Sequence, residues 1–110
     1  MKKIIYILVL ATLSCPVFAA WDGTVTGKIK QIDVEALNGN NAGFRVALEG
    51  KPSLCGNQHT WAYVNRSDDN YQTAVSVILA AKMAGTPVTL YTNKNAGWSD
   101  YCHIGYIVLR

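Results

Sequence analysis

One segment of the chain has the spacing of a helix, and every other patterned segment predicts a strand. Residues 70–85 read "NYQTAVSVILAAKMAG", in which apolar residues recur at intervals of three and four. Gly85 is a favourable residue at a helix C-terminus, and Pro87 prevents the helix from continuing. Three strand patterns precede the helix and two follow it, which restricts the fold to a small sheet with one covering helix.

The strand patterns define the order of the fold. In the first, apolar residues change from one phase to the other near Lys30 and Gln31, which predicts a bulge or a bend there. The five predicted strands span residues 23–35, 44–50, 60–65, 87–93 and 101–110. With the helix between the third and fourth strands, this is the order of an OB-fold, a five-stranded Greek-key barrel. An open α+β sheet covered by one helix fits the same order and remains the alternative.

The first 19 residues have the features of a secretory signal peptide. Lys2 and Lys3 precede an apolar run, and small residues lead to a cleavage site after Ala19. Acylation of Cys15 is the alternative, although the usual leucine three residues before it is missing. The mature domain, residues 20–110, is therefore predicted to be secreted or periplasmic.

The mature domain is nearly neutral. Removal of residues 1–19 leaves eight Lys and Arg against seven Asp and Glu, a net charge of +1. Trp61 and Tyr63 could stack on bases, but the broad positive surface typical of nucleic-acid-binding proteins is missing. No later segment is long and apolar enough to span a bilayer. We therefore predict no nucleic-acid partner and no membrane span.

Two cysteines, Cys55 and Cys102, remain in the mature domain, and an even number in an exported chain predicts a disulfide. The bond would close a loop of about 48 residues and contribute about 4 kcal/mol in the chain-entropy model. It argues against a Cys–His nucleophile formed by Cys102 and His103, as does the opposite direction of neighbouring side chains in a strand. No ligand spacing connects His59 with His103, so we predict no metal and no cofactor. The carboxylates are scattered and nothing pairs them for acid–base chemistry, so we predict no enzymatic activity. A small hydrolase whose catalytic residues come together only in the fold is the alternative.

The predicted helix has two different faces. One side is an apolar stripe that should cover the core, formed by Tyr71, Ala74, Val75, Ile78 and Leu79. The opposite side is mostly small and uncharged, and it includes Thr73, Val77, Ala80 and Ala84. Small proteins tolerate such a neutral surface, but it also suits an interface between copies in a ring.

Several segments resemble the B subunits of secreted AB5 toxins, most closely the subtilase-cytotoxin type and less closely the pertussis-like type. The segment "TGKIKQI" is similar to the first strand of that family, and "FRVALEGK" is similar to the second. The segment "YQTAVSVILAAKMAGTPVTLYTN" resembles the helix and the strand that follows it. These segments cover roughly half of the mature chain, and their order and spacing carry the resemblance.

The resemblance implies an OB-fold subunit that assembles as a homopentamer, with its helices around a central axis. Thr73, Val77, Ala80 and Ala84 would then form the oligomer interface. In that family the ring carries a catalytic A subunit, and its outer wall binds sialylated or related host glycans. The alternative is a monomeric periplasmic OB-fold protein, or an inhibitor, that binds a protein partner.

Five residues are candidates for glycan binding. The resemblance implies a hydroxyl contact at Thr26, and the family's fourth-strand tyrosine is matched here by Thr92, directly after Tyr91. Trp98 and Tyr101 lie near the last predicted loop, and sugar sites combine aromatic faces with hydroxyl and amide groups. A structural role for Trp98 in packing the loop is the alternative.

Overall fold

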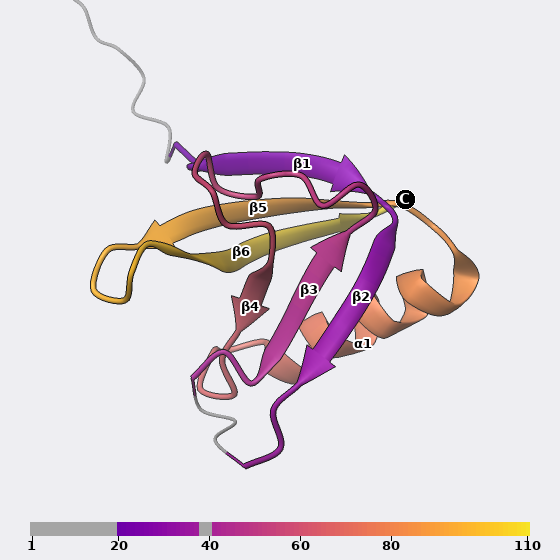
Figure 1. Cartoon of the computed structure of the whole chain (residues 1–110). Coiled ribbons are helices and arrows are strands. Elements are labelled where there is room, and N and C mark those ends of the chain that lie inside the picture. Colours follow the sequence, from indigo (N-terminus) through magenta and orange to yellow (C-terminus); the bar gives the residue numbers. More distant parts are fainter. Residues whose placement is uncertain (1–19, 38–40) are drawn as a thin grey trace, which may run out of the picture.

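The computed structural model describes residues 20–37 and 41–110. The predicted signal peptide, residues 1–19, lies outside the described residues. The described chain forms one helix and six strands (Figure 1). Their bounds are β1 Gly23–Gly27, β2 Ile29–Val34, β3 Phe44–Leu48, β4 Ala62–Val64, α1 Tyr71–Ala84, β5 Val88–Asn95 and β6 Tyr101–Leu109.

The strands form one mixed sheet in the order β1-β5-β6-β4-β3-β2. All neighbours run antiparallel except β4 and β6, which are parallel. In Figure 1, β1, β5 and β6 lie across the upper part of the molecule, and β2 and β3 descend at a steep angle to them. α1 lies on the lower side, where it contacts β2 and β6. The prediction of a mostly β domain with one helix is confirmed.

The ladders do not form a closed five-stranded barrel. The first predicted strand is divided at Lys28 into β1 and β2, which pair with β5 and β3 respectively. These two strands are the edges of the sheet, and no ladder among the described residues joins them. The register of β2 against β3 shifts between Ile29 and Gln31, where the change of apolar phase predicts a bulge.

α1 packs on the core through most of the predicted stripe. Ile78 is fully buried, and Tyr71, Ala74 and Val75 pack partly against the core. Leu79 is 43% exposed, so its predicted place in the core is wrong. Ala81 is buried instead, since it follows Ile78 by three positions and lies on the same side of the helix.

A disulfide joins Cys55 to Cys102, 47 residues later, as the cysteine count predicts. Both cysteines are fully buried. Gly23 in β1 lies directly against the loop that carries Cys55, since a Cβ atom there would collide with the carbonyl oxygen of Leu54. The Thr92 hydroxyl in β5 donates a hydrogen bond to the same carbonyl. One loop thus contacts β1 and β5 and is covalently bonded to β6.

Candidate functional site

Most aromatic side chains of the described residues gather in two clusters. The first, here named the wall platform, comprises Trp21, Tyr91 and Tyr106. The second, the loop cluster, lies near the β5–β6 loop and comprises His59, Trp61, Tyr63, Trp98, Tyr101 and His103. The structure thereby separates the predicted glycan residues, because Tyr91 lies in one cluster, and Trp98 and Tyr101 lie in the other.

Trp21 is the centre of the wall platform. Its ring stacks on Tyr106 with centroids 6.5 Å apart and meets Tyr91 edge-on at 5.8 Å. The two tyrosines lie opposite each other on β5 and β6, with ring centroids 5.1 Å apart. Trp21 is 37% exposed and Tyr106 is 55% exposed, so both present ring surface to solvent. Gly105 leaves the space for the indole, since a Cβ atom there would collide with it.

Two hydrogen bonds fix the chain beside Trp21. The Asp22 N–H donates to Asn93 Oδ1 over 3.1 Å, and the Lys94 N–H donates to Asp22 Oδ2 over 2.8 Å. They connect the chain before β1 to β5, across sequence separations of 71 and 72 residues. A platform that is held in position before a ligand arrives loses less conformational entropy on binding.

Threonine hydroxyls border the wall platform. Thr24 lies opposite Tyr91, and Thr26 lies opposite Thr89, on the paired strands β1 and β5. The hydroxyl oxygens of Thr26 and Thr89 are hydrogen-bonded at 2.7 Å. Thr24 and Thr26 are exposed. Thr26 and Tyr91, two of the predicted glycan residues, therefore share one face of the sheet.

Thr92 faces the interior of the domain. Its side chain is fully buried, and its hydroxyl donates to the Leu54 carbonyl. Successive side chains in a strand point to opposite faces, so the outward position of Tyr91 turns Thr92 inward. A ligand on the outer wall can reach Tyr91 but not Thr92, which removes Thr92 from the candidate site.

The loop cluster packs mainly against itself. The ring of Tyr101 lies 4.8 Å, between centroids, from each of three neighbours: His59, Trp61 and Trp98. Trp98 also meets Tyr63 edge-on at 5.5 Å. These contacts cover much of each ring, and they favour the structural role of Trp98 in packing the loop.

Tyr63 lies at the buried base of the loop cluster. Its hydroxyl accepts a hydrogen bond from Asn95 Nδ2 over 2.9 Å. Burial raises the pKa of Tyr63 above 10.0, and the charge of Asp68 raises it further, although the hydrogen bond from Asn95 opposes both. A fully buried ring cannot stack on a base, so Tyr63 does not support nucleic-acid binding.

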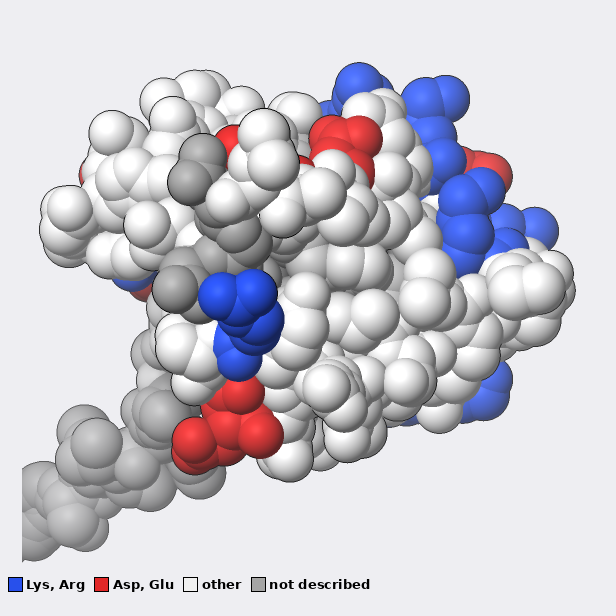
Figure 2. Space-filling model, turned by 90° about the horizontal axis from the view of Figure 1, so that it is seen from below, with Lys and Arg blue, Asp and Glu red and all other residues white. Residues whose placement is uncertain are grey.

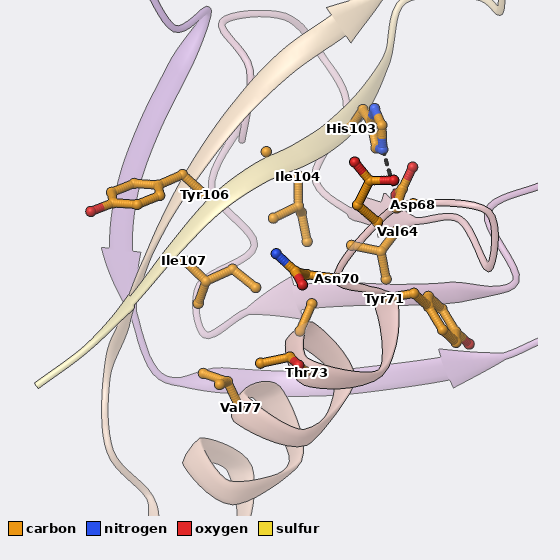
Figure 3. A pocket seen from close by; sticks show the side chains of 13 residues that line it. Val64, Asp68, Asn70, Tyr71, Thr73, Val77, His103, Ile104, Tyr106 and Ile107 are labelled. Atoms are coloured by element: carbon orange, nitrogen blue, oxygen red, sulfur yellow. Dashed lines mark hydrogen bonds and ion pairs between the residues drawn. The ribbon is translucent and has the colours of Figure 1, made fainter.

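A cavity of about 430 Å³ lies between β6 and the N-terminal half of α1 (Figure 3). The side chains of Asn70, Ile104 and Ile107 point into this space. At one end of it, His103 Nε2 donates a hydrogen bond to Asp68 Oδ2 over 2.8 Å. The cavity therefore has an apolar part and one polar end.

The residues of the predicted oligomer interface lie in two different environments. Thr73 and Val77 line the cavity, whereas Ala80 and Ala84 are exposed further along α1. Met83, which is 88% exposed, adds to the surface of the second pair. The view from below in Figure 2 shows a broad uncharged area in its lower right, with charged side chains along the borders.

Cys102 and His103 are adjacent in sequence but do not form a reactive pair, because Cys102 is bonded to Cys55. Across residues 20–37 and 41–110, no three His, Cys, Asp or Glu side chains gather as a metal site would require. Within the same described part of the chain, none of the helical structure has the length and apolar character to cross a bilayer.

Comparisons of this chain with protein-family models, with curated proteins and with solved structures find no match. No relative therefore assigns a role to either aromatic cluster or to the cavity. The function has to be inferred from the geometry of these three features.

Trp21 and Tyr106 are the members of the wall platform that the sequence analysis does not predict. Trp21 lies close to the predicted signal cleavage site, and its neighbours on β5 and β6 are more than 60 residues away in sequence. Gly105 is the one signal that could have indicated Tyr106, since glycine inside a strand often marks a bulge or a close approach. The register of β5 against β6 does shift beside it, between Tyr91 and Thr92.

We expect the buried Tyr63 to make the domain less stable at alkaline pH. Its pKa is raised in the folded state, so the folded protein holds the phenolic proton more tightly than the unfolded chain does. The stability from this difference is fully present below pH 10.0, the unfolded value, and is lost as the pH rises through the folded pKa.

Denaturant titrations at increasing pH measure this effect. The free energy of unfolding of the wild type should fall above about pH 10, and Tyr63→Phe should show a smaller fall. Tyr101→Phe is the matched control, because Tyr101 is a partly exposed tyrosine of the same cluster. An identical pH dependence in the wild type and in Tyr63→Phe would contradict the expectation.

Proposed function

We propose that this chain is an exported glycan-binding module and that the wall platform is its binding surface. One observation carries the proposal: the indole of Trp21 is fixed beside two tyrosines yet stays 37% exposed. A tryptophan needed only for packing would contribute more by burying its whole ring. The partly open platform is instead suited to receive an apolar surface from a ligand.

The side chains of the wall platform and of its border suit a sugar ligand. A sugar ring has an apolar C–H face that stacks on aromatic rings, and hydroxyls at its rim that need hydrogen-bond partners. The rings of Trp21 and Tyr106 offer the first, and the hydroxyls of Thr24 and Thr26 offer the second. The resemblance to AB5 toxin B subunits supports the same surface, because it implies a sugar contact at Thr26.

We further propose that the domain is an OB-fold, and the connectivity supports this. β1 and β2 are opposite edges of the sheet, yet only Lys28 separates them in the chain. The sheet must therefore curl until its two edges approach each other at that residue. If β1 and β2 count as one bent strand, α1 falls between the third and fourth strands, as in the partly open Greek-key barrel of an OB-fold.

The exposed side of α1 supports assembly of the module as a ring. Ala80 and Ala84 are small and exposed, and Met83 is an apolar side chain open to solvent. Burial of this surface against copies of itself would remove apolar area from water. The resemblance implies that the ring has five copies and that its partner is a catalytic A subunit. The predicted signal peptide supports a secreted or periplasmic location.

A glycan array with the purified mature protein tests the binding proposal, followed by calorimetry with the strongest ligand. Trp21→Ala should weaken binding by about tenfold or more, because it removes the stacking surface. Thr26→Val should weaken it less, through the loss of one hydroxyl. Trp98→Ala is the matched control and should bind as the wild type does. An array without ligands, or equal binding by Trp21→Ala, would refute the proposal.

Sedimentation of the mature protein at micromolar concentration tests the ring. The wild type should sediment as a pentamer, and Ala80→Asp should dissociate it, because five carboxylates would be brought close to the axis. Ser53→Asp, a change at an exposed loop position, is the control and should leave the size unchanged. A monomeric wild type would favour the alternative of a monomeric protein that binds a protein partner.

A further inference from the structure

One edge of β6 has no partner over most of its length. β4 ends at Val64, and only Ala62 and Tyr63 pair with β6, opposite Cys102 and His103. β6 continues to Leu109, and in the described chain its later residues pair with β5 alone. In a strand about half of the backbone N–H and C=O groups point to each side. The edge of β6 beyond His103 therefore presents unpaired donors and acceptors.

The cavity lies directly beside this edge. Gly105 and Ile107 of β6 form one wall, and Thr73, Ala74 and Val77 of α1 form the other. In Figure 3 the ring of Tyr106 leaves β6 on the opposite side from the cavity. Tyr106 also borders the cavity, but its ring leaves β6 on the far side, so an occupant at the backbone edge of β6 would leave the rings of Trp21 and Tyr91 open.

The shape and the lining of the cavity suit an extended chain. Val64, the last residue of β4, borders the cavity, so a strand placed there would continue the line of β4 along β6. Val77, Ile104 and Ile107 provide apolar surface for side chains that point inward. An added strand would satisfy the free edge by main-chain hydrogen bonds, and its alternate side chains would fill the apolar part.

The lining of the cavity carries acidic side chains and no Lys or Arg. Asp68 and Asp69 line its polar end. Asp68 already accepts hydrogen bonds from His103 and from the Asn65 N–H, but Asp69 is exposed. A basic side chain on the occupant would complement this end.

We propose that this cavity binds an extended peptide segment of another protein, which adds a strand to the free edge of β6. The segment alternates apolar and polar side chains and carries a lysine or arginine that lies near Asp68 and Asp69. The site shares only Tyr106 with the wall platform, and the proposal does not depend on glycan binding.

The experiment uses the mature protein and a synthetic peptide of about six residues, with alternating valine and threonine and a lysine at each end. Control peptides keep the same length and the same valine–threonine alternation. One has glutamate in place of both lysines. Two others keep the lysines and have N-methyl groups on alternate backbone amides, one peptide for each of the two phases, so that in one of them the amides that would face β6 cannot donate. Binding is measured by calorimetry, and hydrogen exchange reports protection of the β6 amides from Gly105 to Leu109.

We expect the lysine peptide to bind and to protect those amides. The glutamate peptide and at least one of the N-methylated peptides should bind about tenfold more weakly or worse. Val77→Glu should weaken binding by a similar factor, because it places a carboxylate in the apolar part of the cavity. Ser76→Glu is the matched control on the adjacent, exposed position of α1 and should bind as the wild type does.

Several results would overturn the proposal. Equal binding of both N-methylated peptides would exclude strand addition, and equal binding of the glutamate peptide would exclude the role of the acidic end. No binding of the lysine peptide would remove the site as proposed. If the free protein associates with itself, and Val77→Glu dissociates it while the peptide does not compete, the occupant is a second copy of the chain and not a foreign peptide.

Discussion

The loop between β3 and β4, which carries Cys55 and is joined to β6 by the buried disulfide to Cys102, supports both aromatic clusters. The bond fixes the loop to β6, and the same loop contacts Gly23 of β1. Its Leu54 carbonyl also accepts a hydrogen bond from the Thr92 hydroxyl of β5. Among the described residues β1 pairs with β5 alone, so this loop is a second support for the strand that follows Trp21. A small domain with a thin core gains much of its order from such a crosslink.

The same loop ends at the loop cluster. His59 Nε2 donates a hydrogen bond to the Ser99 carbonyl over 3.0 Å, and Asn57 Nδ2 donates to the Asp100 carbonyl over 2.9 Å. These bonds hold the β5–β6 loop, and the rings of the cluster pack upon it. The loop cluster therefore contributes mainly to the position of the loop, and the wall platform is left as the aromatic surface that is open to a ligand.

Features that depend on local chemistry could be predicted from the sequence, and features that depend on distant pairing could not. Gly85 ends α1 in a left-handed conformation, with φ 67°, as its residue type predicts. The apolar phase change near Lys30 and the even cysteine count are equally local signals. The exposure of Leu79, the outward position of Tyr91 and the contact of Trp21 with Gly105 depend instead on contacts between segments far apart in sequence. The cavity depends on β4 being shorter than β6, which no residue pattern in β4 indicates.

The proposed glycan site depends most on Trp21, and the three tryptophans of the chain allow a direct test. The measurement is an NMR titration of the labelled mature protein with an oligosaccharide ligand, in which each indole N–H is followed separately. We expect the Trp21 signal to shift with ligand concentration, and the signals of Trp61 and Trp98 to stay in place. A shift of Trp61 or Trp98 with an unchanged Trp21 would contradict the proposed site and would assign sugar binding to the loop cluster.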